Sequence, residues 1–357
     1  MHKHFLLAAL EQARLGRGHC APNPAVGAVA VYNDQIVAQA FHSGAGLPHA
    51  ERELLQQLPE VCTDIVIYVT LEPCNHWGRT PPCVDGLIER RVHTVVFAYR
   101  DPNPLVADNN TTKRLQAHGI QVVYYPVPEI DAFYESYAYW LRTGLPWVTV
   151  KMAQTFDGHI AGPQGQRVML SNLSCSNFTH QQRAWADVIL TTAQTINQDD
   201  PALNVRQLGE THAKVVAILD RQGRLNPDAK IFSTSQRCLI YHEAVYPVHQ
   251  LLSNRCDLFC TPSQASGLDL LDVLRHLGQL GFHDVWVEAG ATLFRALHRE
   301  RLVNRTYLYL VPRVLGTEAI ALYQDLDIFE HGHQVQWRVM DDNVMAIFNW
   351  SLTCSPV

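Results

Sequence analysis

The first half of the chain alternates between helix-like and strand-like patterns of apolar residues. Apolar positions recur at helical spacing from Phe5 to Leu15, and Gly16 and Gly18 follow, which predicts a helix that ends there. The extended runs 26–32 and 36–38 flank a polar Asn33-Asp34 pair, which predicts a β-hairpin. Later segments predict helices and strands in turn: helices 49–58, 82–91 and 129–142, and strands 64–71, 94–99 and 121–127. This alternation indicates a three-layer α/β domain.

A second domain is expected after Gly144-Leu145-Pro146, where the composition changes to turn-forming residues. Five β-branched runs follow, interspersed with longer segments: 147–152, 188–192, 214–220, 237–241 and 283–288. The chain of 357 residues is longer than one hydrophobic core usually supports. The predicted organisation is therefore two α/β domains, residues 1–144 and 145–357.

Composition narrows the classes of partner. A formal net charge of −6 gives no broad cationic surface, so duplex nucleic acid is not an expected partner. No signal peptide is recognisable at the N-terminus, and no apolar stretch reaches the roughly 18 residues of a membrane span. Nine cysteines, an odd number, favour thiols and metal ligands in a reducing cytoplasm over a disulfide framework.

The sharpest chemical signal is His49-Ala50-Glu51 followed by two cysteines, Cys74 and Cys83. One imidazole and two thiolates make a three-ligand Zn²⁺ site with a fourth position for water, as catalytic zinc requires. Zinc lowers the pKa of its water to about 7. Glu51 is placed to take the water proton and return it to a leaving amine as general acid/base. This is the His-x-Glu and Pro-Cys signature of zinc deaminases.

Other interpretations of this pattern stay open. Each half of the motif alone is common by chance, and a single cysteine is usually a small buried apolar residue. A structural zinc site would need a fourth protein ligand, for which His76 is the near candidate. A nucleic-acid base deaminase with an appended domain is a further alternative. The eight residues between Cys74 and Cys83, where the nucleobase deaminase signature has two, argue against it.

The motifs around this site resemble the RibD family of bifunctional riboflavin-biosynthesis deaminase/reductases. The resemblance is carried by short polar motifs: Pro22-Asn23-Pro24-Ala25-Val26-Gly27, His42 with Gly46, Thr70-Leu71-Glu72-Pro73, Gly78-Arg79-Thr80-Pro81-Pro82 and Asp101-Pro102-Asn103-Pro104. It implies a cytidine-deaminase-like first domain in which Asn23 and Arg79 hold a pyrimidine and its sugar phosphate. A turn cap for Asn23 and a solvated charge for Arg79 are the alternatives.

The second half lacks Gly-x-Gly-x-x-Gly, so a Rossmann dinucleotide site is not supported. It has three polar clusters instead: a strand and Asp-Gly turn at 151–158, a polar loop at 195–206, and a strand, glycine turn and helix start at 285–293. Free N–H groups at such a helix start bind phosphate well, although strand–glycine–helix turns are common.

Taken in order, these clusters resemble the reductase domain of the same family, with a dihydrofolate-reductase-like α/β fold and NADPH as cofactor. The resemblance implies one set of NADPH contacts: Ala153, Thr195, Asp199, Gly290, Ala291, Thr292 and Leu293. It implies a second set for the ribityl-phosphate substrate: Arg183, Leu203, Arg206 and Glu288. Arginine suits an anionic substrate because guanidinium binds phosphate bidentately, although each arginine alone is more often a surface charge.

The implied reaction is hydrolytic deamination of 2,5-diamino-6-ribosylamino-4(3H)-pyrimidinone 5′-phosphate, followed by reduction of the ribosyl to a ribityl chain. Several positions depart from the family pattern: Arg167, Met169 and His159 in the second domain, and Asp108-Asn109-Asn110 in the first. They leave open a diverged paralogue that keeps only the deaminase step. Arg221 is a candidate for the 2′-phosphate of NADPH or a solvated charge. A homo-oligomer is also open.

Overall fold

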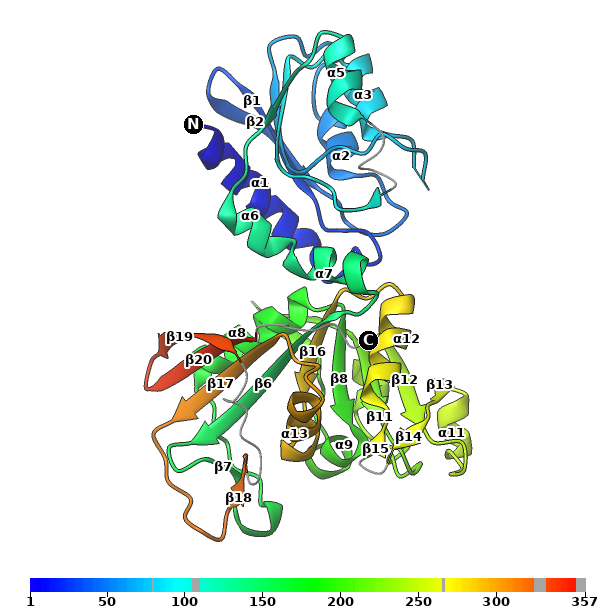
Figure 1. Cartoon of the computed structure of the whole chain (residues 1–357), viewed down its shortest axis with the longest axis vertical. Helices are drawn as coiled ribbons and strands as arrows, with labels where there is room; N and C mark the ends of the chain where they lie inside the picture. Colours follow the sequence, from blue (N-terminus) through cyan, green and yellow to red (C-terminus); the bar gives the residue numbers. More distant parts are fainter. Residues whose placement is uncertain (79, 105–109, 208, 265–266, 324–331, 351–357) are drawn as a thin grey trace. The chain divides into compact units, whose positions relative to one another are not determined.

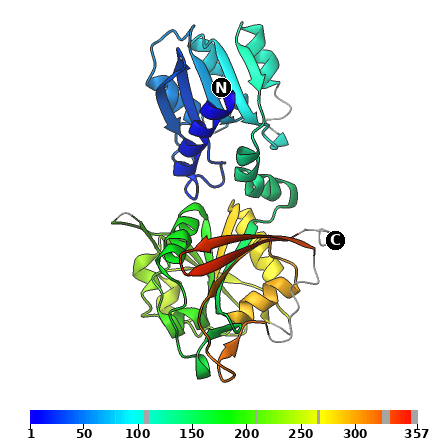
Figure 2. The same cartoon turned by 90° about the vertical axis from the view of Figure 1, so that its left-hand side faces the viewer.

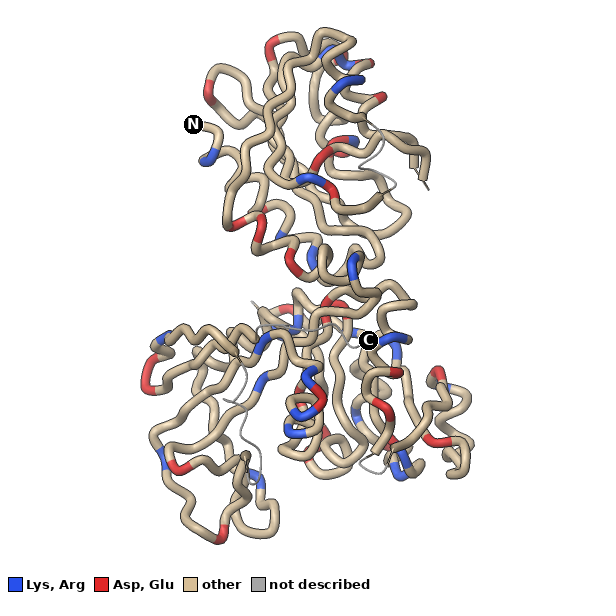
Figure 3. The backbone as a smooth tube through the Cα atoms, in the orientation of Figure 1, with Lys and Arg blue, Asp and Glu red and all other residues tan. Residues whose placement is uncertain are grey.

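The computed structural model describes residues 1–78, 80–104, 110–207, 209–264, 267–323 and 332–350. The chain divides into two compact units, Met1–Gly144 and Leu145–Val357. Among the described residues, none of the helices combines the length and the apolar character needed to cross a membrane. Lys and Arg are spread over both units and interspersed with Asp and Glu (Figure 3).

The first unit is built on a five-stranded sheet in the order β2-β1-β3-β4-β5 (Figure 1). β1 pairs antiparallel with β2 and β3, whereas β3, β4 and β5 are parallel. The strands are β1 (Gly27–Tyr32), β2 (Gln35–Phe41), β3 (Val66–Leu71), β4 (Thr94–Tyr99) and β5 (Gln121–Tyr124). The helices are α1 (His2–Gly16), α2 (Ala50–Gln56), α3 (Cys83–Glu89), α5 (Thr111–Ala117), α6 (Pro128–Phe133) and α7 (Glu135–Thr143).

Alternating side chains of this sheet feed two separate cores, because successive strand residues point to opposite faces. Ala28 and Ala30 of β1 pack with apolar side chains of α2, α3 and α5 on one face. Val29 and Val31 pack with α1, α6 and α7 on the other face. The predicted three-layer arrangement is confirmed, and so is the hairpin, in which Asn33 and Asp34 both adopt positive φ.

The predicted helix over 129–142 is wrong in one respect, because the structure has two helices that meet at Tyr134. Tyr134 is 1 % exposed and leaves helical geometry with φ −92° and ψ 5°. Its hydroxyl lies 2.6 Å from the Thr70 hydroxyl, within hydrogen-bond distance, and donates to the Ala25 carbonyl at 2.9 Å. The break turns this phenol into the core between strands, a tertiary contact that periodicity does not encode.

The second unit contains a nine-stranded sheet in the order β13-β12-β11-β8-β16-β6-β17-β20-β19. The seven strands from β13 to β17 are parallel, and β20 and β19 complete the sheet antiparallel. These strands are β6 (Trp147–Thr155), β8 (Val188–Thr192), β11 (Val215–Leu219), β12 (Arg237–His242), β13 (Asp257–Cys260), β16 (Asp284–Glu288), β17 (Arg305–Val311), β19 (His333–Met340) and β20 (Asn343–Trp350).

Helices cover both faces of this sheet. One core joins the sheet to α8 and α9, and α12 and α13 lie over the opposite face (Figures 1 and 2). The helices are α8 (Leu173–Trp185), α9 (Ala193–Asp199), α10 (Ile231–Thr234), α11 (Gln250–Ser253), α12 (Leu270–Gln279), α13 (Ala291–Arg299) and the 3-10 turn η1 (Pro163–Gly165). Short two-stranded ribbons are formed by β7 (His159–Ala161) with β18 (Ile320–Ala321), β9 (Val205–Gln207) with β10 (Glu210–His212), and β14 (Ser263–Gln264) with β15 (Gly267–Leu268).

The segment predicted as a polar loop over 195–206 begins instead as the helix α9. The Thr192 hydroxyl accepts a hydrogen bond from the Thr195 amide at 3.1 Å and so caps the helix start. Asp200 then ends the helix in the left-handed conformation. The polar composition had indicated a loop, but an N-cap and a buried Ile196 are sufficient to form two turns of helix.

Candidate functional site

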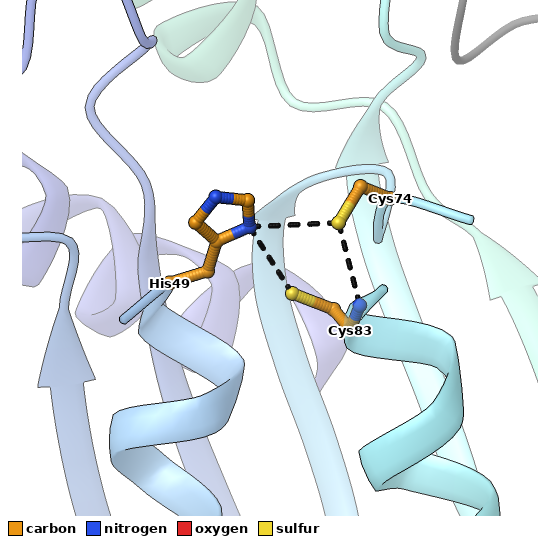
Figure 4. A group of neighbouring side chains, drawn as sticks. All are labelled: His49, Cys74 and Cys83. Carbon is orange, nitrogen blue, oxygen red and sulfur yellow. Dashed lines mark hydrogen bonds between the residues drawn. The ribbon is translucent and has the colours of Figure 1, made fainter. Parts of the chain in front are cut away.

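The three predicted zinc ligands meet at one point of the first unit. His49 is the residue before α2, Cys83 is the first residue of α3, and Cys74 lies on the segment that leaves β3. The Cys74 and Cys83 thiols both face Nδ1 of His49 (Figure 4). The antiparallel hairpin and the parallel β3–β4 pair bring the two helix starts to the same edge of the sheet, so residues 34 positions apart become neighbours.

The geometry of this triad fits a tetrahedral zinc ion. Nδ1 of His49 lies 3.5 Å from the Cys74 sulfur and 3.3 Å from the Cys83 sulfur. Zinc bonds of about 2.3 Å to sulfur and about 2.0 Å to nitrogen, at tetrahedral angles, place these atoms about 3.5 Å apart. The Thr80 hydroxyl lies 3.3 Å from Nε2 of His49, on the far side of the ring, and so helps to orient the imidazole.

The two thiols differ in how readily they hold negative charge. Hydrogen bonding from Cys83, reinforced by the neighbouring His49, lowers the pKa of the Cys74 thiol to about 4 despite its burial. The backbone amide of Cys83 also points at the Cys74 sulfur, at 3.3 Å. A thiolate is the form that binds a metal, and Cys74 favours that form. The hydrogen bond with Cys74 and burial raise the pKa of the Cys83 thiol, so Cys83 would release its proton on binding the metal.

Glu51 lies beside the triad, in a cavity of about 310 Å³. It occupies the first turn of α2, two residues after His49, and is only 3 % exposed. Burial raises the pKa of the Glu51 carboxyl. A carboxyl of this kind, next to an open metal position, can both accept and return a proton.

The structure also bears on the structural-zinc alternative. His76 lines the same cavity, but among the described residues the ligand atoms that converge within 4.8 Å belong to His49, Cys74 and Cys83 alone. Three protein ligands leave a coordination position for water or substrate, which is the arrangement of catalytic zinc rather than structural zinc.

Asn23, a predicted substrate contact, lines this cavity, and its side chain contacts His42. The Asn23 amide nitrogen lies 3.2 Å from Nε2 of His42, whose Nδ1 lies 2.9 Å from the Pro48 carbonyl. Nδ1 therefore donates to the carbonyl and Nε2 accepts from Asn23, a neutral tautomer that agrees with the lowering of the His42 pKa by burial. Arg79, the other predicted substrate contact, is outside the described residues.

Three further residues of the cavity were not singled out for a role from the sequence: Asp101, Asn103 and Tyr137. Asp101 is 8 % exposed and accepts hydrogen bonds from the Asn103 amide and the Tyr137 hydroxyl, at 2.9 and 3.4 Å. Burial raises the pKa of Asp101 to about 6. The Asp-Pro-Asn-Pro motif was visible in the sequence, but its proximity to the zinc ligands depends on β3 and β4 being adjacent.

The second unit has its own cavity, of about 800 Å³, at the ends of its parallel strands. The residues predicted to contact NADPH all line it: Ala153, Thr195, Asp199, Gly290, Ala291, Thr292 and Leu293. The residues predicted to contact substrate line it too: Arg183, Leu203, Arg206 and Glu288. Segments up to 140 residues apart are thus brought together, because β6, β8, β11 and β16 lie side by side in parallel.

An ion pair lies within this cavity. Nε and Nη2 of Arg183 donate to the two carboxylate oxygens of Glu288 at 2.5 and 2.9 Å, and the Trp286 indole donates to Glu288 at 2.8 Å. Burial raises the pKa of Glu288, but the Arg183 guanidinium and these hydrogen bonds outweigh it and lower the pKa to about 2. Glu288 is therefore held as a carboxylate in a fixed orientation.

Lys151, at the C-terminal half of β6, is a lining residue to which the sequence reasoning assigned no role. Its ammonium group lies 5.4 Å from the centre of the Tyr309 ring. Burial lowers the Lys151 pKa, and the nearby Glu288 opposes that shift. A lysine in the middle of a largely buried strand was the available signal.

The departures from the family pattern in the second unit fall in or near the same cavity. Arg167 and Met169 line it, and the Met169 side chain is 67 % exposed. His159 instead faces Asp157, with Nδ1 3.1 Å from the carboxylate, in the Asp-Gly turn after β6. Asp108 and Asn109 are outside the described residues, and Asn110 precedes α5 in the left-handed conformation.

Comparison with known proteins agrees with this division of the chain. The family model described as the cytidine and deoxycytidylate deaminase zinc-binding region matches residues 1–99, and the model described as the RibD C-terminal domain matches residues 146–345. The zinc triad lies within the first match, and the large cavity of the second unit lies within the second.

The similarity extends over nearly the whole chain. Riboflavin biosynthesis protein RibD of Haemophilus influenzae is 36 % identical over 90 % of this chain and 88 % of its own, and the Escherichia coli protein of the same name is 32 % identical over 90 % of each. The Acinetobacter baumannii RibD structure superposes with a TM-score of 0.85 at 30 % identity, covering 98 % of this chain and 99 % of its own.

A Thermotoga maritima structure gives a TM-score of 0.86 at 28 % identity and covers 98 % of each chain. It is described as a diaminohydroxyphosphoribosylaminopyrimidine deaminase/5-amino-6-(5-phosphoribosylamino)uracil reductase. The expected fold, a cytidine-deaminase-like domain followed by a RibD-type reductase domain, is confirmed. This chain therefore belongs to the RibD family, the bifunctional zinc deaminase/reductases of riboflavin biosynthesis.

Proposed function

We propose that this chain catalyses two consecutive steps on one pyrimidine phosphate. In the first unit, water replaces the 2-amino group of 2,5-diamino-6-ribosylamino-4(3H)-pyrimidinone 5′-phosphate, and ammonia leaves. In the second unit, the ribosyl carbon C1′ is reduced by NADPH to give the ribityl chain. The observation that carries this proposal is the convergence of His49, Cys74 and Cys83 around one point, with Glu51 buried beside them.

In the first unit, His49, Cys74 and Cys83 would hold zinc, which when bound supplies an activated water at neutral pH. Glu51 takes a proton from that water and returns one to the departing amine, within the same cavity. Asn23 presents its amide to the pyrimidine, and its orientation is set by the hydrogen bond to His42. Because Glu51 is only 3 % exposed, its carboxyl is shielded from bulk water.

In the second unit, the cofactor and the substrate would share the large cavity, and NADPH when bound supplies the hydride. Gly290, Ala291 and Thr292 form the start of α13, where their backbone amides would bind phosphate groups of the cofactor. Ala153, Thr195 and Asp199, which line the same cavity, are assigned to the cofactor. These residues are the NADPH contacts that the family resemblance implied.

The two arginines assigned to the substrate, Arg183 and Arg206, have different roles. Arg183 is engaged with Glu288 and with the Asn204 carbonyl, so it orients the carboxylate. Arg206 is exposed and lines the cavity, which suits it to the substrate phosphate. Leu203 is buried and contributes an apolar part of the cavity lining.

Arg221 is assigned to the 2′-phosphate of NADPH. It lies just after β11, lines the cavity, and its Nε donates to Glu243 at 2.8 Å. The Ser263 hydroxyl donates to the other oxygen of Glu243 at 2.8 Å. This chain of hydrogen bonds holds the guanidinium at the cavity wall, where a phosphate could share it.

An assay on the purified protein tests the two-step proposal. The pyrimidine phosphate is supplied with and without NADPH, and ammonia and NADPH are both followed. Ammonia should appear in both reactions, and NADPH should be consumed only after deamination. Ammonia release with no loss of NADPH would reject the reductase step, and a preparation with full zinc content but no ammonia release would reject both.

The enzyme is further proposed to be a homo-oligomer that pairs through β19, the edge strand of the large sheet. Val335, Trp337 and Val339 alternate along β19, so they share one face, and they are 40 %, 62 % and 75 % exposed. An exposed apolar edge strand invites a second copy of the chain. Trp337→Glu should lower the mass measured by light scattering, whereas Val245→Glu, at a position 72 % exposed in the same unit, should not.

The cytoplasm is the proposed site of action. All eight cysteines among the described residues are free thiols, and the zinc site needs two of them as thiolates. Immunodetection of the tagged protein in a cytoplasmic fraction tests this assignment, and recovery in the periplasm would reject it.

A further inference from the structure

The short helix α5 contacts both of the segments that carry the cysteine ligands of the metal centre. Nη1 of Arg114 donates to the Asn75 side chain at 2.5 Å, and Nη2 donates to Asp85 at 2.6 Å. Asn75 directly follows one predicted ligand, Cys74, and Asp85 lies two residues after the other, Cys83. One guanidinium therefore links the two cysteine-bearing segments.

A second contact from α5 holds the other side of Cys74. The hydroxyl of Thr111, the first residue of the helix, donates to the Pro73 carbonyl at 3.0 Å. Thr111 is 1 % exposed, so this hydrogen bond is shielded from water. The residues immediately before and after Cys74 are thus both held by the same helix.

The helix itself is firmly anchored. Leu115 is fully buried in the core that also contains Val84 and Leu87 of α3. Cys74, by contrast, lies on a stretch in which residues 72–78 form neither helix nor strand. Its own direct contacts to α3 are the Cys83 amide on its sulfur and the Val84 amide on its carbonyl, at 3.3 and 3.2 Å.

We propose that Thr111 and Arg114 are positioning residues of the metal centre, which set the separation of the two thiolates. Neither touches a ligand atom; they act through Pro73, Asn75 and Asp85. The planar guanidinium suits this task because its two nitrogens donate in fixed directions to two different segments. The inference rests on the zinc site of the proposed function and goes beyond it by assigning residues outside the zinc-binding motif.

The rate of zinc release from the full-length, zinc-loaded protein tests this inference. A chromogenic chelator in excess reports the transfer of zinc with time. Thr111→Val and Arg114→Met should each release zinc about tenfold faster than the unsubstituted protein, as expected when contacts that orient metal ligands are removed. Lys113→Met removes an exposed cation from the same helix and should leave the rate unchanged.

Conservative variants separate positioning from general damage to the fold. Thr111→Ser keeps the hydroxyl and should release zinc at the original rate. Arg114→Lys keeps the charge but reaches one partner instead of two, so its rate should lie between those of the arginine and methionine forms. NADPH binding by the second unit, followed by fluorescence, should be the same in all variants.

The outcomes distinguish this inference from the proposed function. If the unsubstituted protein bound no zinc, the proposed function itself would fail. If it bound zinc but Thr111→Val and Arg114→Met released it no faster, the positioning role would be rejected while the deaminase assignment stood. Equal acceleration by Lys113→Met would also reject it, because the effect would then be one of overall charge.

Discussion

The guanidinium of Arg183 and the carboxylate of Glu288 face each other inside the cavity of the second unit, joined by two hydrogen bonds of 2.5 and 2.9 Å. One comes from α8 and the other from the end of β16. Breaking such a buried pair leaves an uncompensated charge, which is costly, whereas replacing both partners is tolerated far better. The pair therefore offers a way to separate stability from catalysis.

Glu288→Gln should reduce the rate of NADPH oxidation at least about thirtyfold, the equivalent of about 2 kcal/mol. It should also destabilise the second unit, because the Arg183 charge loses its partner. The double variant with Arg183→Met should regain thermal stability but not reductase activity. Ammonia release serves as the internal control and should not change. Recovery of NADPH oxidation in the double variant would show that the pair is structural only.

Glu51→Gln should slow ammonia release by about 10²- to 10⁴-fold, because an amide cannot move the proton between water and leaving amine. Zinc content, measured by mass spectrometry, should remain that of the parent protein. Glu53→Gln, two residues further along α2, is the matched control and should be fully active. Unchanged ammonia release in Glu51→Gln would refute the assigned role.

Asp101 should give the stability of the first unit a distinct dependence on pH. Its pKa of about 6 in the folded protein exceeds the value near 4 of an unfolded aspartate, so the folded state binds the proton more tightly. Stability from this group therefore increases as the pH falls from 7 to 5, by about 1 kcal/mol.

Asp101→Asn removes this titration and keeps the shape of the side chain. Denaturant unfolding at saturating zinc, at pH 7 and pH 5, should show the unsubstituted protein gaining about 1 kcal/mol relative to the variant at the lower pH. If the unfolding free energies of the two proteins differed by the same amount at pH 7 and pH 5, Asp101 would not titrate between these pH values.

Arg221→Ala should raise the KM for NADPH about tenfold, the effect of losing one charge-assisted hydrogen bond to phosphate. The KM for NADH, which has no 2′-phosphate, should stay the same. Arg237→Ala is the matched control, since Arg237 is paired with Asp257 on the outer strands of the same sheet. If the KM values for NADPH and NADH increased equally, Arg221 would not contact the 2′-phosphate.

Several elements were predictable because their signals are local. Asn33-Asp34 between two apolar runs predicted the hairpin, and the helix predicted over 49–58 is present as α2, with His49 as its N-cap. The strand, glycine turn and helix start over 285–293 appear as β16 and α13, with Gly290 as the N-cap. In each case the residues that determine the conformation are adjacent in the sequence.

Other features of the fold were not predicted. Helix α5 was not predicted, since it is only seven residues long and has few apolar positions. The strand β19 was also missed, although Val335, Trp337 and Val339 alternate with polar residues along it. The break at Tyr134 depends on Thr70 and Ala25, which lie far away in the chain.

By itself the sequence determined the chemistry: an imidazole, two thiols and a carboxyl at deaminase spacing, and a second half with reductase motifs. Only the tertiary structure decided which side chains share a cavity, that Arg183 is engaged by Glu288, and that α5 holds the segments around Cys74. Ligand type and turn geometry are properties of single residues and their neighbours. Proximity across a sheet depends instead on strand order, which emerges only when the whole core is packed.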